Sequence, residues 1–150
     1  AGGLFAYYDI NLPPGSGGSQ AFAAWILTQG VPANQQGALD DPDGDGFNNG
    51  AEFALGTHPN QHGDKPTLVT GTTVDGAQTY PSVTFIRRKN VAGVTVAVDG
   101  ATDVSFNPTS PTTTLTPIDL GNGTESVTVR GNTPISGAAA FYFRVKVTAP

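Results

Sequence analysis

Apolar and polar residues alternate near the start of the chain. Alternation with a period of two predicts a β-strand over residues 4–12 with one buried face. The apolar face would carry Leu4, Ala6, Tyr8, Ile10 and Leu12. Residues 13–18 are Pro, Gly and Ser only, which predicts a flexible linker between this strand and the rest of the chain.

The expected N-terminal strand needs a partner, because an isolated strand leaves its backbone groups unpaired and its apolar face uncovered. It can pair with a sheet of its own chain. It can also reach a neighbouring molecule and complete that molecule's sheet, as in donor-strand complementation. In the second case the five apolar residues named above form the assembly contact. The sequence leaves both possibilities open.

After the linker the hydrophobic pattern changes to that of a helix. A helix is predicted over residues 20–29, because Ser19 can cap its start and Gly30 can stop it. Trp25, the only tryptophan, lies on the apolar stripe of this helix and is expected to pack in a core. A second, short helix is predicted over about residues 49–55.

From residue 66 onward the pattern is one of short strands separated by turns. Strands are expected near residues 67–74, 78–88, 94–99, 101–106, 112–120, 124–130 and 140–148. Three dipeptides predict hairpin turns between them: Asp75-Gly76, Asp99-Gly100 and Asn122-Gly123. Seven strands of this length indicate an antiparallel, immunoglobulin-like sandwich, without the Cys–Trp–Cys signature of antibody domains. The one basic cluster, at residues 87–89, is expected to be a solvated strand end or a guard of a sheet edge.

The acidic loop between the two expected helices has the ligand spacing of an EF-hand calcium loop. Counted from Asp41, residues 41–52 place carboxylates at positions 1, 3, 5 and 12 and a glycine at position 6. Calcium takes about six to eight oxygen ligands, and alternate residues of a tight loop can supply them. The predicted ligands are Asp41, Asp43, Asp45, the backbone carbonyl of Phe47, Asn49 and Glu52. The alternative is a solvated acidic turn, since Asp and Gly are common turn formers.

The flanking residues favour one structural site over a pair of sensor sites. Gly30 and Pro32 end the entering helix well before the loop, and polar Asn48 stands at position 8, where paired EF-hands carry an aliphatic residue. The expected organisation is therefore a mainly β protein with three segments. They are an N-terminal strand and linker (1–18), a helix–calcium loop–helix segment (19–65) and the sandwich (66–150).

The stretch from Asp41-Pro42-Asp43-Gly44-Asp45-Gly46 to Glu52-Phe53-Ala54-Leu55-Gly56-Thr57-His58-Pro59 resembles a bacterial module. This module is similar to thrombospondin type 3 repeats and dockerins and occurs in large secreted proteins of environmental Gram-negative bacteria, followed by a β-rich segment. Phe53 and His58 stand where the module has Tyr and Asp. The resemblance implies an exported, calcium-stabilised surface module and names no enzyme activity.

Charge and composition limit which partners and which cellular location the chain can have. Charged residues make up 13% of the chain, against about 25% in average soluble domains. Most of the net charge of −5 arises from the loop region, so there is no basic surface for nucleic acid. No apolar run is long enough for a membrane span. The uncharged polar residues (Thr, Ser, Asn and Gly), the small residues at the start and the calcium loop favour a secreted, extracellular or cell-surface protein.

Three classes of function are considered: an enzyme, a binding module and a structural protein. No nucleophile, phosphate-loop or zinc motif is present, so the chain is not expected to be an enzyme. A calcium-dependent carbohydrate-binding or surface-attachment module is the alternative, with Tyr7, Tyr8, Tyr80 and Tyr142 as candidate contacts for polysaccharide. The favoured reading is a calcium-stabilised structural protomer that associates with copies of itself in an extracellular fibre or matrix, with exchange of the N-terminal strand as its route.

Overall fold

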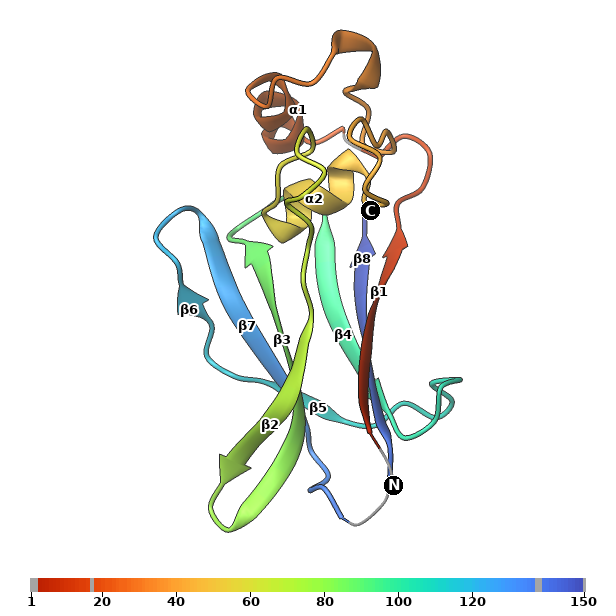
Figure 1. Cartoon of the computed structure of the whole chain (residues 1–150), viewed down its shortest axis with the longest axis vertical. Helices are drawn as coiled ribbons and strands as arrows, with labels where there is room; N and C mark the ends of the chain where they lie inside the picture. Colours follow the sequence, from red (N-terminus) through yellow and green to blue (C-terminus); the bar gives the residue numbers. More distant parts are fainter. Residues whose placement is uncertain (1–2, 17, 137–138, 150) are drawn as a thin grey trace.

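The computed structural model describes residues 3–16, 18–136 and 139–149. Within them the chain forms two β-sheets packed face to face, and the helices and the acidic loop sit over one end (Figure 1). The mainly β, two-sheet architecture expected from the sequence is confirmed. The elements are β1 (Leu4–Asn11), α1 (Gln20–Leu27), the 3-10 helix η1 (Ala33–Gln35), α2 (Asn49–Leu55), β2 (Val69–Asp75), β3 (Gln78–Arg88), β4 (Thr95–Ala101), β5 (Thr112–Thr114), β6 (Ile118–Asp119), β7 (Thr124–Gly131) and β8 (Phe141–Thr148).

The first sheet has the order β1-β8-β4. β8 pairs antiparallel with β4 and parallel with β1, so that Val145 lies between Val98 and Tyr8. In this single chain the N-terminal strand therefore docks on the chain's own sheet. The central strand alternates as expected, with four inward residues that are all buried: Phe141, Phe143, Val145 and Val147.

The second sheet has the order β2-β3-β7-β5, and β6 pairs with the other end of β7; all of these pairs are antiparallel. The Asp75-Gly76 turn between β2 and β3 is confirmed, with Gly76 at φ 60°. The turn at Asn122-Gly123 is also confirmed, between β6 and β7. The strand expected over 112–120 is instead two short strands, β5 and β6.

The hairpin predicted at Asp99-Gly100, and with it the strand over 101–106, is wrong, because both residues lie inside β4. Asp99 accepts hydrogen bonds from Arg144 and Lys146 of the adjacent strand β8 at 2.8 and 2.9 Å. Gly100 is required by packing, since a Cβ there would lie 2.9 Å from the Phe141 ring. Asp99 is present for a cross-strand ion pair, and Gly100 for a close contact with Phe141. In the sequence, an Asp-Gly dipeptide with these roles looks the same as one that forms a turn.

The core between the sheets joins the inward residues of β8 to those of β3 and β7. Val83, Phe85, Val127 and Val129 are all almost fully buried. Burying each such side chain contributes about 1.5–3 kcal/mol, so this interface is the main source of stability of the sandwich. Tyr8 and Ile10 of β1 pack against it from the edge and are only partly buried.

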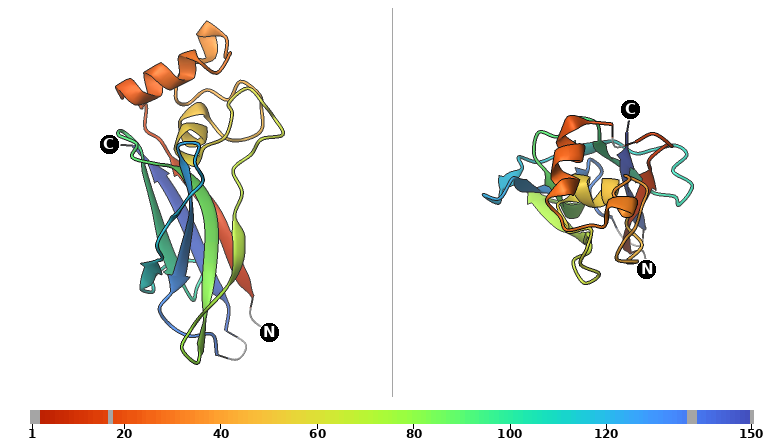
Figure 2. Two further views of the ribbon diagram at one scale, coloured as in Figure 1. Left: turned by 90° about the vertical axis from the view of Figure 1, so that its left-hand side faces the viewer. Right: turned by 90° about the horizontal axis from the view of Figure 1, so that it is seen from above.

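The helices form a second, smaller cluster at one end of the sandwich (Figure 2). Ser19 caps α1 by accepting from Phe22 N at 3.1 Å, as predicted, but α1 ends at Leu27, earlier than expected. Phe22 and Ile26 of α1 pack on Phe53 of α2. Trp25 is half-buried and belongs to the same cluster, which confirms its structural role.

The basic cluster at 87–89 is not a solvated strand end. Arg88 lies over the rings of Trp25 and Phe53, at 5.4 and 5.0 Å, and its Nε donates to the Phe53 carbonyl at 2.7 Å. Arg87 points inward and pairs with Glu125 at 2.8 Å. Arg88 thus fastens the helical end to β3 by cation–π contacts that the charge pattern alone does not show. None of the helices in the described part of the chain is both long and apolar enough to cross a membrane.

Candidate calcium site

The acidic loop folds around the carboxylate of Asp41. Its Oδ1 accepts from the backbone N–H groups of Gly44 at 2.9 Å and Asp45 at 3.2 Å, and its Oδ2 accepts from Gly46 N at 3.0 Å. Gly44 and Gly46 adopt positive φ values of 71° and 97°, which glycine reaches without a steric penalty. Gly46, at the predicted sixth position, therefore permits the reversal, and Gly44 does the same two residues earlier.

The fold brings the first three predicted ligands together. Asp41, Asp43 and Asp45 each offer a carboxylate oxygen, and these oxygens all lie within 4.8 Å of one another. The Oδ2 atoms of Asp43 and Asp45 are buried and accept no hydrogen bond within the described chain. Burial and the neighbouring carboxylates raise the pKa of Asp43. Such an arrangement is costly without a cation, because like charges repel and buried oxygens lack partners.

Glu52 approaches this trio from the first turn of α2 and is 0% exposed. Its Oε1 accepts a long hydrogen bond of 3.3 Å from Thr57 Oγ1, and its Oε2 has no partner in the described chain. Burial, followed by repulsion from Asp43 and Asp45, raises the pKa of Glu52 to about 8. The tight group of ligand oxygens contains the three aspartates and not Glu52. Glu52 is thus a fully buried acid close to the trio.

Asn49 has a structural role that the loop spacing did not predict. Its Nδ2 donates to the carbonyls of Gln35 and Gly37, both at 2.8 Å, and ties the segment after η1 to the start of α2. Its Oδ1 is buried and has no partner among the described residues. Asn48 caps α2 by accepting from Ala51 N at 3.0 Å. The sequence signal for these roles is an Asn-Asn pair at the start of a short helix. Asn48 caps the helix, and Asn49, its first residue, binds the backbone of residues 35 and 37.

Phe47 joins the loop to the sandwich through its ring, which meets Tyr8 of β1 edge to face at 5.8 Å between centroids. His62 adds an outer contact, with its Nδ1 2.9 Å from the carbonyl oxygen of Asp43. His58 is exposed and pairs with Asp64, which is not one of the predicted ligands. The carbonyl of Phe47 remains a predicted ligand.

The donor set has the chemistry of a hard cation site. The three clustered side chains and Glu52 offer carboxylate oxygens, and Asn49 offers an amide oxygen, with no nitrogen or sulfur donor in the trio. Calcium prefers oxygen ligands of this kind from a flexible loop. The buried Oδ2 atoms of Asp43 and Asp45, which have no partner in the described chain, give independent support, because a cation held by the trio would satisfy both. The trio can therefore hold a metal ion, and its oxygen donors are compatible with calcium.

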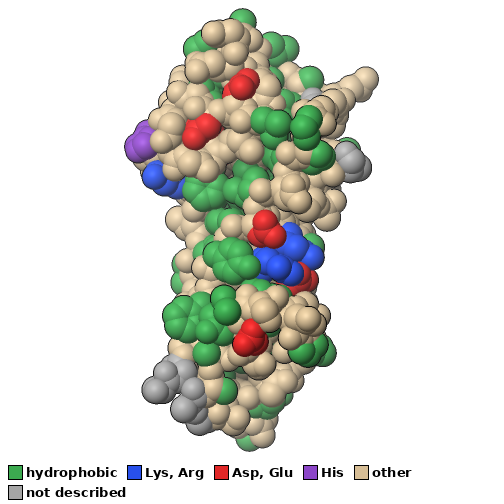
Figure 3. All heavy atoms as spheres, turned by 90° about the vertical axis from the view of Figure 1, so that its right-hand side faces the viewer, with side chains coloured by type: hydrophobic (Ala, Val, Ile, Leu, Met, Phe, Trp, Pro, Cys, Tyr) green, Lys and Arg blue, Asp and Glu red, His purple; other side chains and the backbone are tan. Residues whose placement is uncertain are grey.

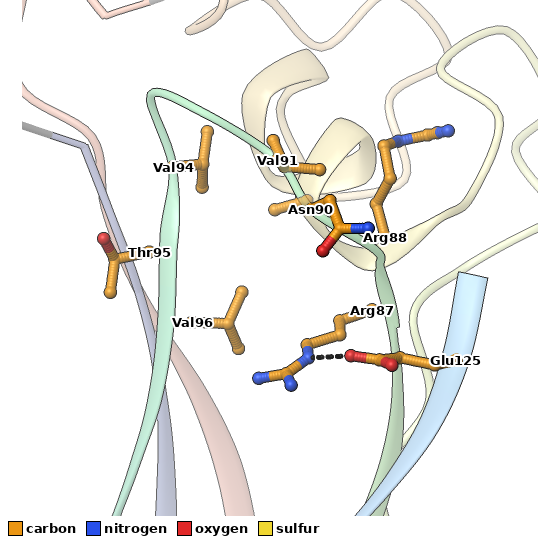
Figure 4. Close-up of a pocket in the computed structure, with 9 residues that line it drawn as sticks. Arg87, Arg88, Asn90, Val91, Val94, Thr95, Val96 and Glu125 are labelled. Carbon is orange, nitrogen blue, oxygen red and sulfur yellow. Dashed lines mark hydrogen bonds and ion pairs between the residues drawn. The ribbon is translucent and has the colours of Figure 1, made fainter. Parts of the chain in front are cut away.

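A separate cleft of about 300 Å³ lies between β4 and the ends of β3 and β7 (Figure 4). Val94 and Val96 form one wall. The ion pair of Arg87 and Glu125 lies opposite, on the inward face of the second sheet. Asn90, at a positive φ of 53°, closes the end next to the helices. The cleft is thus a half-open space between the sheets with mixed apolar and charged walls.

The four candidate tyrosines do not form one strip. Tyr7 and Tyr142 lie on the outer face of the first sheet, opposite to the buried residues of β8. On this side of the molecule hydrophobic side chains gather beside side chains of both charges (Figure 3). There the exposed ring of Phe5 stacks on Tyr142 at 5.2 Å. Tyr80 stacks under Arg130 on the second sheet, and Tyr8 faces the core.

Comparison of the chain with protein-family models, with curated proteins and with solved structures gives no match.

Proposed function

We propose that this protein is a secreted, calcium-stabilised structural protomer that forms an extracellular fibre or matrix with copies of itself, by exchange of β1. The observation that carries the proposal is the placement of β1. It is an edge strand, paired in parallel with β8, and it comes from the opposite end of the chain. Parallel neighbours in a sheet require a long crossover, so the position of β1 is not a product of local hairpin formation.

The strand order supports an immunoglobulin-like sandwich in which one strand position is occupied by the N-terminal strand β1 instead of by a strand that follows β8. Constant-type immunoglobulin domains have the strand orders A-B-E-D and C-F-G. The orders β2-β3-β7-β5 and β4-β8-β1 correspond to them, with β1 in the place of strand G. In an immunoglobulin domain strand G follows F and pairs with it antiparallel, whereas β1 precedes all other strands and lies parallel to β8.

The linker after β1 permits exchange. Pro13, Pro14 and Gly15 are exposed, and Pro offers no backbone donor that would fasten them to a sheet. β1 presents Leu4, Tyr8 and Ile10 to the core, and Leu12 follows it as a buried anchor. Full burial of four such side chains would contribute about 6–12 kcal/mol before entropic costs. Leu4, Tyr8 and Ile10 are only partly buried, so their contribution is smaller than this.

The same contacts form whether the strand comes from its own chain or from a copy. Exchange between identical chains therefore changes mainly entropy and linker strain, and high protomer concentration favours it. Exchange in a head-to-tail sense gives an open chain of protomers instead of a closed dimer. The charge-poor, Thr-rich sequence suits surfaces that become buried between protomers.

Paired cysteine variants test the exchange, because the chain has no native cysteine. Phe5 and Tyr142 are register partners on the outer face of the sheet. Neighbouring strands lie about 4.7–4.9 Å apart, which is within the range of Cα separations for a disulfide. We expect Phe5→Cys chains mixed with Tyr142→Cys chains to give covalent heterodimers under oxidation. A double Phe5→Cys/Tyr142→Cys chain, oxidised while dilute, should stay monomeric in light scattering and form no filaments in electron microscopy until it is reduced.

The matched control is Tyr7→Cys mixed with Tyr142→Cys, because these positions are not register partners. If mixed Phe5→Cys and Tyr142→Cys chains give no more heterodimer than this control, the exchange is refuted.

The cleft of Figure 4 favours a second candidate, a calcium-dependent carbohydrate-binding or surface-attachment module. Arg87, Glu125 and Asn90 offer hydrogen-bonding groups of the kind that hydroxylated ligands use, and its size is at the lower end for ligand sites, about 300–1,000 Å³. A glycan array with wild-type protein and the Arg87→Ala variant tests it. Binding that the variant loses supports the candidate, and the absence of any glycan binding removes it.

A further inference from the structure

The slot that holds β1 extends beyond the sheet and reaches the acidic loop. At the middle of β1, the Tyr8 ring leaves the strand on its inner face and meets the Phe47 ring edge to face. The Tyr8 hydroxyl donates to the Thr67 carbonyl at 2.8 Å, on the segment that leads into β2. Burial raises the pKa of Tyr8, so the hydroxyl stays protonated as a donor. Tyr8 is therefore held from two sides by parts of the chain outside the first sheet.

The end of the strand is seated on the helix that follows the loop. Leu12 is buried and packs against Gly50 in the first turn of α2, where a Cβ would lie only 2.5 Å from Leu12 Cδ1. Gly50 N donates to the Ala38 carbonyl at 2.9 Å, which fixes this turn against the segment that enters the loop. The seat thus requires glycine at position 50 and a fixed start of α2.

Both anchors depend on the conformation of the loop. Phe47 occupies the seventh position of the loop, and Gly50 lies between two other predicted ligands, Asn49 and Glu52. The clustered aspartates and the buried Glu52 repel one another unless a cation lies among them. A bound cation would hold the backbone around Phe47 and Gly50 in one arrangement, and its loss would free both.

We infer that the acidic loop forms one wall of the docking slot for β1, and that cation binding to the loop controls how firmly the slot holds this strand. The occupant is the segment 4–12, from the same chain or, if the proposed function holds, from a second copy. Tyr8 and Leu12 are the anchors, and Phe47 and Gly50 are their seats.

Hydrogen–deuterium exchange of the full-length chain, with calcium and with EGTA, tests the inference. We expect the amides of residues 7–11 to exchange at least about tenfold more slowly with calcium. Phe47→Ala keeps the backbone carbonyl but removes the ring. It should still bind calcium in calorimetry. The ratio of the exchange rate in EGTA to the exchange rate in calcium, at residues 7–11, should fall toward one. Phe47→Leu, which keeps apolar bulk, should give an intermediate ratio and serves if the alanine variant does not fold.

The matched control is Phe5→Ala. Phe5 lies on the outer face of β1, 51% exposed, against Tyr142 and away from the loop. This variant should loosen β1 with and without calcium and leave the ratio unchanged. The inference is overturned if calcium protects the loop amides but leaves those of β1 unaffected, or if Phe47→Ala retains the wild-type ratio.

The exchange measurement separates this inference from the proposed function. In one outcome, calcium slows exchange in β1, but the single-cysteine variants never cross-link between molecules. This outcome would refute assembly by strand exchange and leave the coupling between loop and strand intact. Filaments that form equally in EGTA, with no change in β1 protection, would support assembly and refute the coupling.

Discussion

The two strands that flank β8, β1 and β4, form opposite edges of the same sheet and differ in how they are covered. β1 is parallel, and its inner face is covered by apolar and aromatic groups, with Phe47 and Thr67 around Tyr8. β4 is antiparallel, and its inner face borders a half-open cleft with the Arg87–Glu125 ion pair opposite. Within the described residues, the outer edge of β4 pairs only through a single bridge, from Gly100 to Ser110.

We interpret this difference as opposite roles for the two edges of the sheet. An inward-pointing charge beside a free edge discourages another strand from adding there, since the charge would lose water. The β1 side has a complementary, apolar slot and a hinge, which are what an exchangeable strand requires. Under the proposed function, the β1 side would accept a strand, and the charged cleft beside β4 would disfavour one.

The largest expected effect comes from a charge in the β1 slot. Ile10→Asp would place a carboxylate among apolar groups of the core, which costs several kcal/mol, about 3–5 by comparison with other uncompensated buried charges. Because the entropic cost of ordering the strand offsets most of its burial energy, this penalty should release β1 from its slot. The loss of stability is then limited to the net docking energy of β1. Limited proteolysis should cut the variant near residues 13–16, and filaments should be absent.

Removal of two loop carboxylates is expected to have the next largest effect. Asp43→Ala combined with Asp45→Ala removes two of the three clustered donors. At calcium concentrations about 100 times the dissociation constant, the wild type gains about 2.7 kcal/mol from the ion, and the variant should gain none. Thermal melts with calcium and with EGTA measure this. Equal melting temperatures for the wild type in the two conditions would exclude the site.

Folding stability and calcium affinity should both depend on pH, because the pKa of Glu52 is raised to about 8 from an ordinary value of 4.5. Between these values the calcium-free folded state keeps a proton that the unfolded state releases. Calcium-free stability should therefore decline as pH rises through this window. Calcium needs the ionised carboxylate, so calcium affinity should rise with pH over the same range.

Melts in EGTA from pH 5 to pH 8 and calorimetric titrations with calcium test this prediction. Glu52→Gln is the matched variant, because the amide is similar in shape and does not titrate. It should flatten the calcium-free pH dependence and weaken calcium binding at every pH. A wild-type chain whose calcium-free stability rises toward pH 8 would contradict the predicted direction.

The smallest expected change in stability concerns the protected edge. Replacement of both Arg87 and Glu125 by Leu removes a partly exposed ion pair, which should alter the free energy of unfolding by no more than about 1 kcal/mol. Association should change more, because the cleft becomes apolar beside a free edge. Light scattering should then show aggregation that does not depend on β1 exchange. A fully monodisperse double variant would mean that the charges do not protect this edge.

The sequence by itself determined those features that depend on neighbouring residues. Alternation in 141–147, the Ser19 cap, the glycines of the acidic loop and the turn at Asp75-Gly76 follow from local backbone geometry and burial, and each is found in the structure. The loop trio was predictable for the same reason, since three alternate residues of a tight turn must converge.

The tertiary structure decided what distant residues do to one another. Asp99-Gly100 reads as a turn but serves a cross-strand ion pair and a close contact with Phe141. The basic residue Arg88 proved to lie over two aromatic rings, because the helical end folds back onto β3. The place of β1 beside β8, and the contact of Tyr8 with Phe47, join segments that no local pattern relates. Local residues set the conformation of each segment, whereas complementary burial between segments chose their partners.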